Sequence, residues 1–199
     1  MRPTFVALAG LAAIAALGST GSAFAQSFDE PFGTDPMDGG QMQYLDNDSQ
    51  VQQSPIPRQL VQFDEKYAPG TIVISTQERR LYFVTQPGEA MEYGVGVGRP
   101  GFSWSGIQRV SAKKEWPSWT PPAAMLKRRP DLPRYMSGGP DNPLGARAMY
   151  LGSSEYRIHG SNEPDTIGQA VSSGCIRMTN EDVVDLYNRV KVGAKVVVL

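Results

Sequence analysis

Cysteine and histidine are nearly absent from this chain of 199 residues, because each occurs once, as Cys175 and His159. A single cysteine excludes an internal disulfide. Structural zinc uses four ligands and catalytic zinc uses three protein ligands, so one of each residue cannot build such a site. No acidic cluster flanks either residue at ligand spacing. We therefore expect no metal and no other cofactor.

Long apolar runs are also missing, apart from one that extends from Phe5 to Leu17. This run is shorter than the roughly 20 residues of a membrane span, so we expect no transmembrane anchor. It follows Arg2 and precedes the small residues of Ala23-Phe24-Ala25, which is the order of a secretory signal peptide. We predict that residues 1–25 are removed after Ala25, without lipidation because no cysteine is near. The protein is then expected in the periplasm.

Basic residues are missing between residues 26 and 57, where six acids lie in a stretch rich in Gln, Gly, Ser and Pro. Such a composition buries too little apolar surface to offset its chain entropy. We predict a disordered acidic linker over residues 26–62, which is either an uninvolved tail or a linker with a binding role. Residues 63–199 are then one domain, long enough to have a hydrophobic core.

The charge balance reverses from Arg58 onward, where eighteen Lys and Arg face fourteen Asp and Glu. Most of the excess lies between Arg99 and Arg134. This basic segment is either a solvated face or a contact for an anionic partner. An exported protein rarely meets nucleic acid, so we expect an acidic cell-wall polymer rather than DNA or RNA.

Short runs rich in β-branched and aromatic residues, separated by Gly and Pro, predict a mainly β fold, either a sandwich or a barrel. The expected strands are Thr71–Ser75, Leu81–Thr85, Met91–Val97, Ile107–Ala112, Ala148–Leu151, Tyr156–Ile158 and Val196–Leu199.

One helix is expected near the C-terminus. Asn180 suits its N-cap, Glu181 and Asp182 suit its first turn, and Gly193 suits its end. The apolar residues at helical spacing are Val183, Leu186, Tyr187 and Val190. The Pro-rich stretch from Trp116 to Pro143 predicts a long irregular excursion without helix or strand, beside which a substrate groove could form. Trp116 and Trp119 within it are either core residues or a ligand platform.

The two scarce residues lie sixteen positions apart and together can perform nucleophilic catalysis. A thiolate is the nucleophilic form of cysteine, and a nearby imidazole can take the thiol proton and stabilise the anion. The alternative is an inert buried cysteine. Small and polar neighbours, Ser172-Ser173-Gly174 before the cysteine and Arg177 after it, favour a reactive thiol with a depressed pKa.

These residues resemble a known signature. His159-Gly160, followed by Ser172-x-Gly174-Cys175-x-Arg177, is similar to the motif of the L,D-transpeptidases, also called the YkuD domain family. Upstream matches are Pro117-Ser118-Trp119-x-Pro121-Pro122 and Gly139-Pro140-Asp141-Asn142-Pro143-Leu144-Gly145, so the resemblance covers about residues 66 to 199. It implies a β-sandwich of mixed sheets with one C-terminal helix and short helical or irregular insertions.

The resemblance also implies an activity, in which Cys175 attacks a peptidoglycan stem tetrapeptide, releases D-Ala and passes the acyl group to an amine. His159 is the implied base, and the N–H groups around Gly174 and Cys175 are expected oxyanion donors. A carbonyl just after the histidine, from Gly160 or Ser161, is expected to fix the imidazole tautomer. Ser172 is expected to hydrogen-bond near the site, and Arg177 either orients substrate or forms a structural ion pair.

One position departs from the family, because Ser173 stands where many members have a histidine directly before the Gly-Cys pair. Three functions stay open from the sequence. The acyl acceptor is diaminopimelate of another stem or an amine of an outer-membrane protein or lipoprotein. Water as acceptor would make the protein an L,D-carboxypeptidase or amide hydrolase. A non-catalytic peptidoglycan-binding module is the third alternative.

Overall fold

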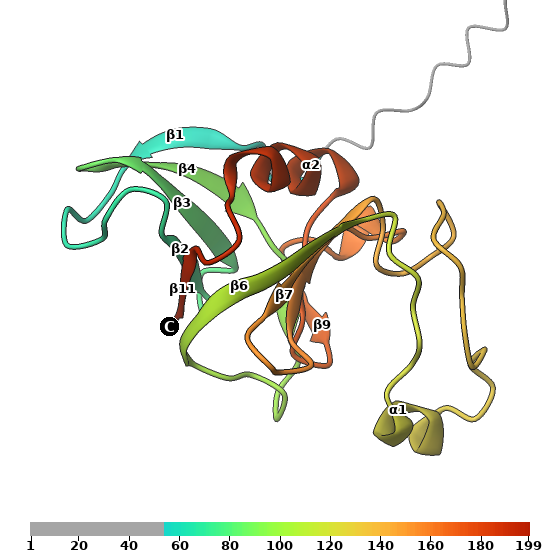
Figure 1. Cartoon of the computed structure of the whole chain (residues 1–199). Helices are drawn as coiled ribbons and strands as arrows, with labels where there is room; N and C mark the ends of the chain where they lie inside the picture. The colour runs from blue at the N-terminus through green and yellow to red at the C-terminus, as the bar shows by residue number, and fades with distance from the viewer. Residues whose placement is uncertain (1–53) are drawn as a thin grey trace, which may run out of the picture. The chain divides into compact units, whose positions relative to one another are not determined.

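The computed structural model describes residues 54–199, which form eleven strands, two α-helices and one 3₁₀ helix (Figure 1). The predicted signal peptide and most of the predicted linker lie outside these residues. The elements are β1 Gln59–Gln62, β2 Ile72–Ser75, β3 Arg80–Gln86, β4 Glu89–Gly94, β5 Val97–Gly98, β6 Gly106–Glu115, α1 Ala123–Arg128, β7 Arg147–Leu151, β8 Arg157–His159, η1 Pro164–Thr166, β9 Ala170–Ser172, β10 Ile176–Arg177, α2 Asn180–Arg189 and β11 Lys195–Val198.

Nine strands form one mixed sheet in the order β1-β4-β3-β2-β11-β6-β7-β8-β10, and β5 pairs with β9 separately. The pairs β2 with β11 and β8 with β10 are parallel, and the other pairs in the large sheet are antiparallel. Strand β6 joins two halves, because its first residues pair with β11 and its later residues with β7. The register shifts between Val110 and Ala112, and such an irregularity bends a strand.

Both halves of the sheet contribute to a single core. Ile72, Ile74 and Leu81 come from one half and pack in the same buried cluster as Met149 and Ile158 from the other. Helix α2 adds the buried residues Val183 and Leu186, and its C-cap Val190 packs in the same cluster, as the sequence pattern predicts. The mainly β fold with a mixed sheet and a C-terminal helix is therefore confirmed.

Several details differ from the sequence prediction. Strand β1 falls inside the predicted linker, so the ordered domain begins before Phe63. The predicted strand Met91–Val97 is divided, since β4 ends at Gly94 and β5 begins at Val97. Helix α1 lies in the excursion that was expected to have no helix; it follows Pro122, where a missing N–H costs nothing.

Helix α2 is capped by Thr179 rather than by Asn180, because the Thr179 hydroxyl accepts from the Asp182 N–H. The Asn180 side chain instead accepts from the Ala146 N–H at 2.8 Å. The helix ends at Arg189 with Val190 as its C-cap, so Gly193 lies beyond it.

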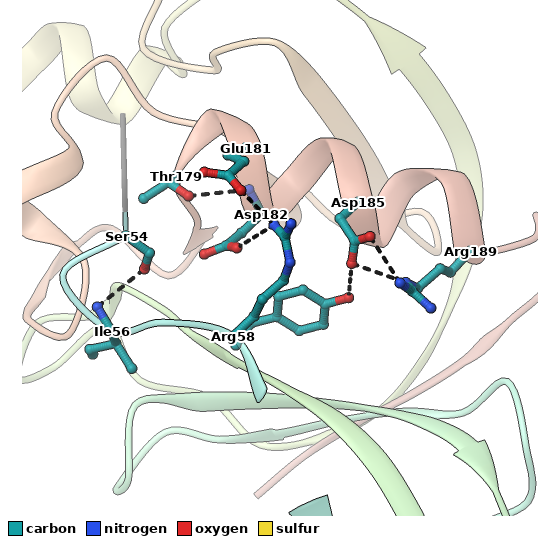
Figure 2. A network of polar contacts seen from close by, with 9 residues as sticks. Ser54, Ile56, Arg58, Thr179, Glu181, Asp182, Asp185 and Arg189 are labelled. Atoms are coloured by element: carbon teal, nitrogen blue, oxygen red, sulfur yellow. Dashed lines mark hydrogen bonds and ion pairs between the residues drawn. The ribbon is translucent and has the colours of Figure 1, made fainter. Parts of the chain in front are cut away.

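The segment from Ser54 to Arg58 lies against α2 (Figure 2). The Arg58 guanidinium forms ion pairs with Glu181 at 3.0 Å and Asp182 at 3.2 Å. Further along the helix, Asp185 accepts from the Tyr93 hydroxyl and pairs with Arg189. We call these six residues the α2 network: Arg58, Tyr93, Glu181, Asp182, Asp185 and Arg189.

Candidate active site

The parallel pair β8 and β10 brings the scarce histidine and cysteine together. Arg177 lies opposite His159 in the ladder, and Ile176 lies opposite Ile158. Successive side chains of a strand point to opposite faces. The two isoleucines are buried in the core, so their neighbours point the other way. Those neighbours, Arg157, His159, Cys175 and Arg177, line one pocket.

His159 is 4 % exposed, and its Nδ1 lies 2.6 Å from the Gly160 carbonyl oxygen. This is the carbonyl contact that the resemblance implies, made by Gly160 and not by Ser161, whose hydroxyl accepts from the Glu163 N–H. With the proton on Nδ1, the basic nitrogen is Nε2. Burial, and then the charge of Arg177, lower the pKa of His159 to about 3. The imidazole is therefore neutral at physiological pH.

Gly160 has a packing requirement of its own. A Cβ at this position would lie 2.3 Å from Oδ1 of Asn180, the atom that binds the Ala146 N–H. Glycine thus lets the chain pass close to the Asn180 side chain, which links α2 to the residue directly before β7.

Burial raises the pKa of the Cys175 thiol, and the nearby Arg157 only partly offsets this effect. The expected depressed pKa is therefore wrong for the free protein. The imidazole and the polar neighbours favour the thiolate, but burial disfavours the charged form and has the larger effect. The thiol faces the Glu155 carbonyl oxygen, with Sγ and O 3.8 Å apart. The resting pair is a neutral thiol and a neutral imidazole.

The turn before the cysteine is held by Ser172 from both sides. Its hydroxyl donates to the Cys175 carbonyl at 2.7 Å and accepts from the Gly174 N–H at 3.0 Å. Gly174 has φ +108°, which other residues rarely adopt, and a Cβ there would lie 2.7 Å from the ring of Tyr156. Ser172 thus forms hydrogen bonds beside the cysteine, and its role in substrate positioning stays a prediction. Since Ser172 engages the Gly174 N–H, this amide is not free to serve as an oxyanion donor in the resting conformation.

A second support for the turn comes from an aromatic pair that the sequence analysis missed. The Trp104 indole N–H donates to the Gly174 carbonyl at 2.8 Å. Its ring stacks on Tyr156, with centroids 4.4 Å apart. The only sequence signal was the presence of aromatics in a polar stretch, which does not reveal a partner 70 positions away.

The remaining predicted polar residues lie at the pocket but differ in their contacts. Arg177 forms an ion pair with Glu163 at 2.9 Å, so the structural alternative for this residue is present. Ser173, in the position of the absent second histidine, lines the pocket and lies 3.5 Å from the Arg99 guanidinium.

The Pro-rich excursion supplies the apolar wall of the pocket. Trp119, Pro122 and Met125 line it from one part of the excursion, and Pro143 and Leu144 from its end. This agrees with the expected groove. Trp119 is therefore not a core residue, and Trp116 is 45 % exposed.

The basic segment does not act as one charged face among the described residues. Arg109 donates to the Gly193 carbonyl, and Lys113 to carbonyls at the end of α2. The guanidinium carbons of Arg99 and Arg128 lie 4.2 and 5.5 Å from the centroid of the Phe102 ring. Several of these charges thus serve local contacts.

Within residues 54–199, no three His, Cys, Asp or Glu side chains gather in a way that could hold a metal ion. No helix among these residues has the length and apolar character needed to cross a membrane.

A mainly β domain with a cysteine and a histidine lining one pocket has the two side chains that nucleophilic catalysis by a thiol requires. The family model of the YkuD L,D-transpeptidase catalytic domain matches residues 69–198. The chain belongs to this family.

Three comparisons illustrate the relationship. The probable L,D-transpeptidase ErfK/SrfK of Escherichia coli is 37% identical over 153 residues, which are 72% of this chain and 48% of that protein. A Brucella melitensis crystal structure named as a probable carnitine operon oxidoreductase is 45% identical, covers 77% of this chain and 99% of that chain, and has a TM-score of 0.50. The oxidoreductase name belongs to that protein.

L,D-transpeptidase 3 of Mycobacterium tuberculosis has a TM-score of 0.54 at 19% identity, covering 65% of this chain and 60% of that chain. At this identity the likeness shows the fold alone. The chain spans about half the length of the curated relative from Escherichia coli.

Proposed function

We propose that this protein is a cysteine-dependent L,D-transpeptidase that acts on peptidoglycan stem tetrapeptides. The observation that carries the proposal is that the parallel pair β8 and β10 brings His159, the last residue of β8, and Cys175, which directly precedes β10, to one pocket that both side chains line. Membership of the family supports the substrate class.

In the first half-reaction, the Cys175 sulfur attacks the carbonyl carbon between the L-centre of diaminopimelate and D-Ala. The thiol proton passes to Nε2 of His159, so a neutral thiol in the free enzyme is an adequate starting state. The C–N bond then breaks, His159 returns the proton to the amino group of D-Ala, and a thioester remains on Cys175.

In the second half-reaction, an amine attacks the thioester carbonyl and gives a proton to His159. The C–S bond breaks and the cysteine recovers its proton. The contact of Nδ1 with the Gly160 carbonyl favours the tautomer that keeps Nε2 available in both steps. The buried, neutral histidine is suited to accept a proton only when a partner thiol or amine gives one up.

Cys175 and His159 do not determine which acyl acceptor enters the second half-reaction. We propose an amine, either of diaminopimelate on another stem or of an outer-membrane protein or lipoprotein. The proposal includes export to the periplasm after removal of residues 1–25, and an oxyanion site that uses the Cys175 N–H, with Gly174 joining once Ser172 releases its amide.

The test is mass spectrometry of the mature protein incubated with disaccharide tetrapeptide, beside the Cys175→Ala variant. We expect released D-Ala and cross-linked dimer from the wild type and neither product from the variant. Tripeptide without dimer, with ample amine acceptor present, would indicate a carboxypeptidase. If neither product forms and the protein still binds peptidoglycan, the binding-module alternative holds and the catalytic proposal fails.

A further inference from the structure

Two arginines line the pocket, and their surroundings differ. The Arg177 guanidinium is neutralised by Glu163, with Nη1 and Oε2 2.9 Å apart. The Nε of Arg157 is buried and has no hydrogen-bond acceptor among residues 54–199, and no carboxylate of these residues forms an ion pair with this arginine as Glu163 does with Arg177. A buried guanidinium N–H without an acceptor is costly, so it indicates a missing partner.

Arg157 is also close to the reacting sulfur. It is the residue of β8 that precedes Ile158, and Cys175 directly precedes Ile176 on the paired strand. Each residue thus precedes one of the two paired isoleucines, and both side chains line the same pocket. The Tyr150 ring lies under the guanidinium, with Cζ 5.6 Å from the ring centroid, and this contact limits where the guanidinium can move.

The substrate of the proposed reaction carries an anion at the corresponding distance. In the leaving D-Ala, the scissile nitrogen is followed by Cα and then by the terminal carboxylate. With bond lengths of about 1.33, 1.46 and 1.52 Å, the carboxylate carbon lies within about 4 Å of the carbonyl carbon that the sulfur attacks. A cation beside the sulfur therefore faces this carboxylate.

We propose that Arg157 binds the terminal α-carboxylate of the residue that leaves, and so makes the enzyme specific for stem peptides that end one residue after the scissile bond. This inference rests on the proposed transpeptidase function. Arg157 is then a specificity residue that touches substrate, and the fork of its guanidinium matches the two carboxylate oxygens. Glu155, the acid that lines the same pocket, forms no ion pair with it among the described residues.

A role in stabilising the thiolate is the competing explanation, and substrate chemistry separates the two. Disaccharide tetrapeptide is compared with the same molecule ending in D-alaninamide, which has no terminal charge. The readout is kcat/KM for D-Ala or D-alaninamide release by the mature enzyme. We expect the wild type to prefer the carboxylate substrate by about 10- to 100-fold, the range of one charge-assisted contact.

In Arg157→Gln, the preference should fall to within about threefold of unity, mainly through loss of activity on the carboxylate substrate. Arg157→Lys keeps the charge without the fork and should retain an intermediate preference. The matched control is Arg147→Gln, another partly buried arginine with an unpartnered Nε that lies on β7 and does not line the pocket. It should keep the wild-type preference.

Equal loss on both substrates in Arg157→Gln would overturn the inference and leave the transpeptidase proposal intact. If this variant does not fold, an unchanged preference in Arg157→Lys overturns it instead, and equal turnover of both substrates by the wild type does so without any variant. Absence of Cys175-dependent turnover of either substrate would mean that the proposed function itself fails.

Discussion

The pocket and the α2 network use the same kinds of residue in different states. In the α2 network, Arg58 pairs with two carboxylates and Arg189 with a third (Figure 2). In the pocket, the buried Nε of Arg157 has no hydrogen-bond acceptor among the described residues. Paired charges at the surface of a domain hold elements together, whereas a charge without a partner near a nucleophile is poised for a ligand. The comparison assigns stability to one region and chemistry to the other.

Asp182 belongs to the α2 network but is only partly paired. One of its oxygens accepts from Arg58, but the other is buried without a partner among the described residues. Burial raises the pKa of this carboxyl group, although Thr179 and Arg58 act against the shift. The α2 network therefore depends on Arg58 more than an exposed ion pair would. Changes in the network should lower stability, and changes in the pocket should lower activity.

The largest expected effect is that of His159→Gln. Glutamine is similar in polarity but cannot take the thiol proton, so kcat should fall by about 10²- to 10⁴-fold. The check is the rate of D-Ala release by a variant that still melts cooperatively. Activity within threefold of the wild type would show that another group moves the proton. The assignment of the chemistry to His159 in the pocket would then be wrong.

The next effect concerns the protonation of the thiol. Because its pKa in the folded protein lies above the ordinary value of about 8.5, Cys175 stays protonated at neutral pH and becomes a thiolate only as the pH rises through that higher pKa. The iodoacetamide alkylation rate, followed by mass spectrometry, should still be increasing above pH 8.5. A plateau reached below pH 8 would contradict the neutral resting pair.

Local sequence patterns predicted most of the fold. Each of the seven expected strands overlaps an observed strand, because the β-branched runs are long enough to indicate a buried, pleated environment. The missed strands are two to four residues long. Strand β1 has the polar sequence Gln-Leu-Val-Gln and exists through its pairing with β4. Pairing between distant segments leaves no local signal at this length.

The N-cap of α2 also depends on a contact between distant segments, which a local sequence pattern does not reveal. Thr179 and Asn180 are both good N-caps, so the local pattern cannot choose between them. The choice depends on Ala146, 34 positions away in the sequence, because its N–H donates to the Asn180 side chain.

The site was predicted from scarcity, since the only cysteine and the only histidine do line one pocket. Arg157 was missed although it lies two positions before His159, and the alternation of a strand would have placed both on one face. The direction of the thiol pKa could not be predicted. Its burial depends on walls that come from distant segments, including Met125 and Leu144.

The third prediction tests the structural half of the comparison. Arg58→Gln leaves the buried Asp182 carboxylate without its cation and should lower the free energy of unfolding by about 1 to 2 kcal/mol, a range discounted for the partial exposure of Arg58. Urea denaturation measures this change, and kcat should stay within twofold. Lys66→Gln, which removes a surface pair with Asp64, is the control and should have no measurable effect. A loss of activity with unchanged stability would reverse the assignment of the two regions.

The smallest expected effect lies where the two regions meet. Thr179 lies two positions after Arg177, the last residue of β10, and caps helix α2, which carries most of the network. Thr179→Ala removes the acceptor for the Asp182 N–H and should cost about 1 kcal/mol of stability, whereas Thr179→Ser keeps the hydroxyl and should cost less than half of that. Both variants should keep the kcat of the wild type if the cap serves the helix alone. If Thr179→Ala lowered kcat and Thr179→Ser restored it, the cap would also position β10, and stability and chemistry would share this one hydrogen bond.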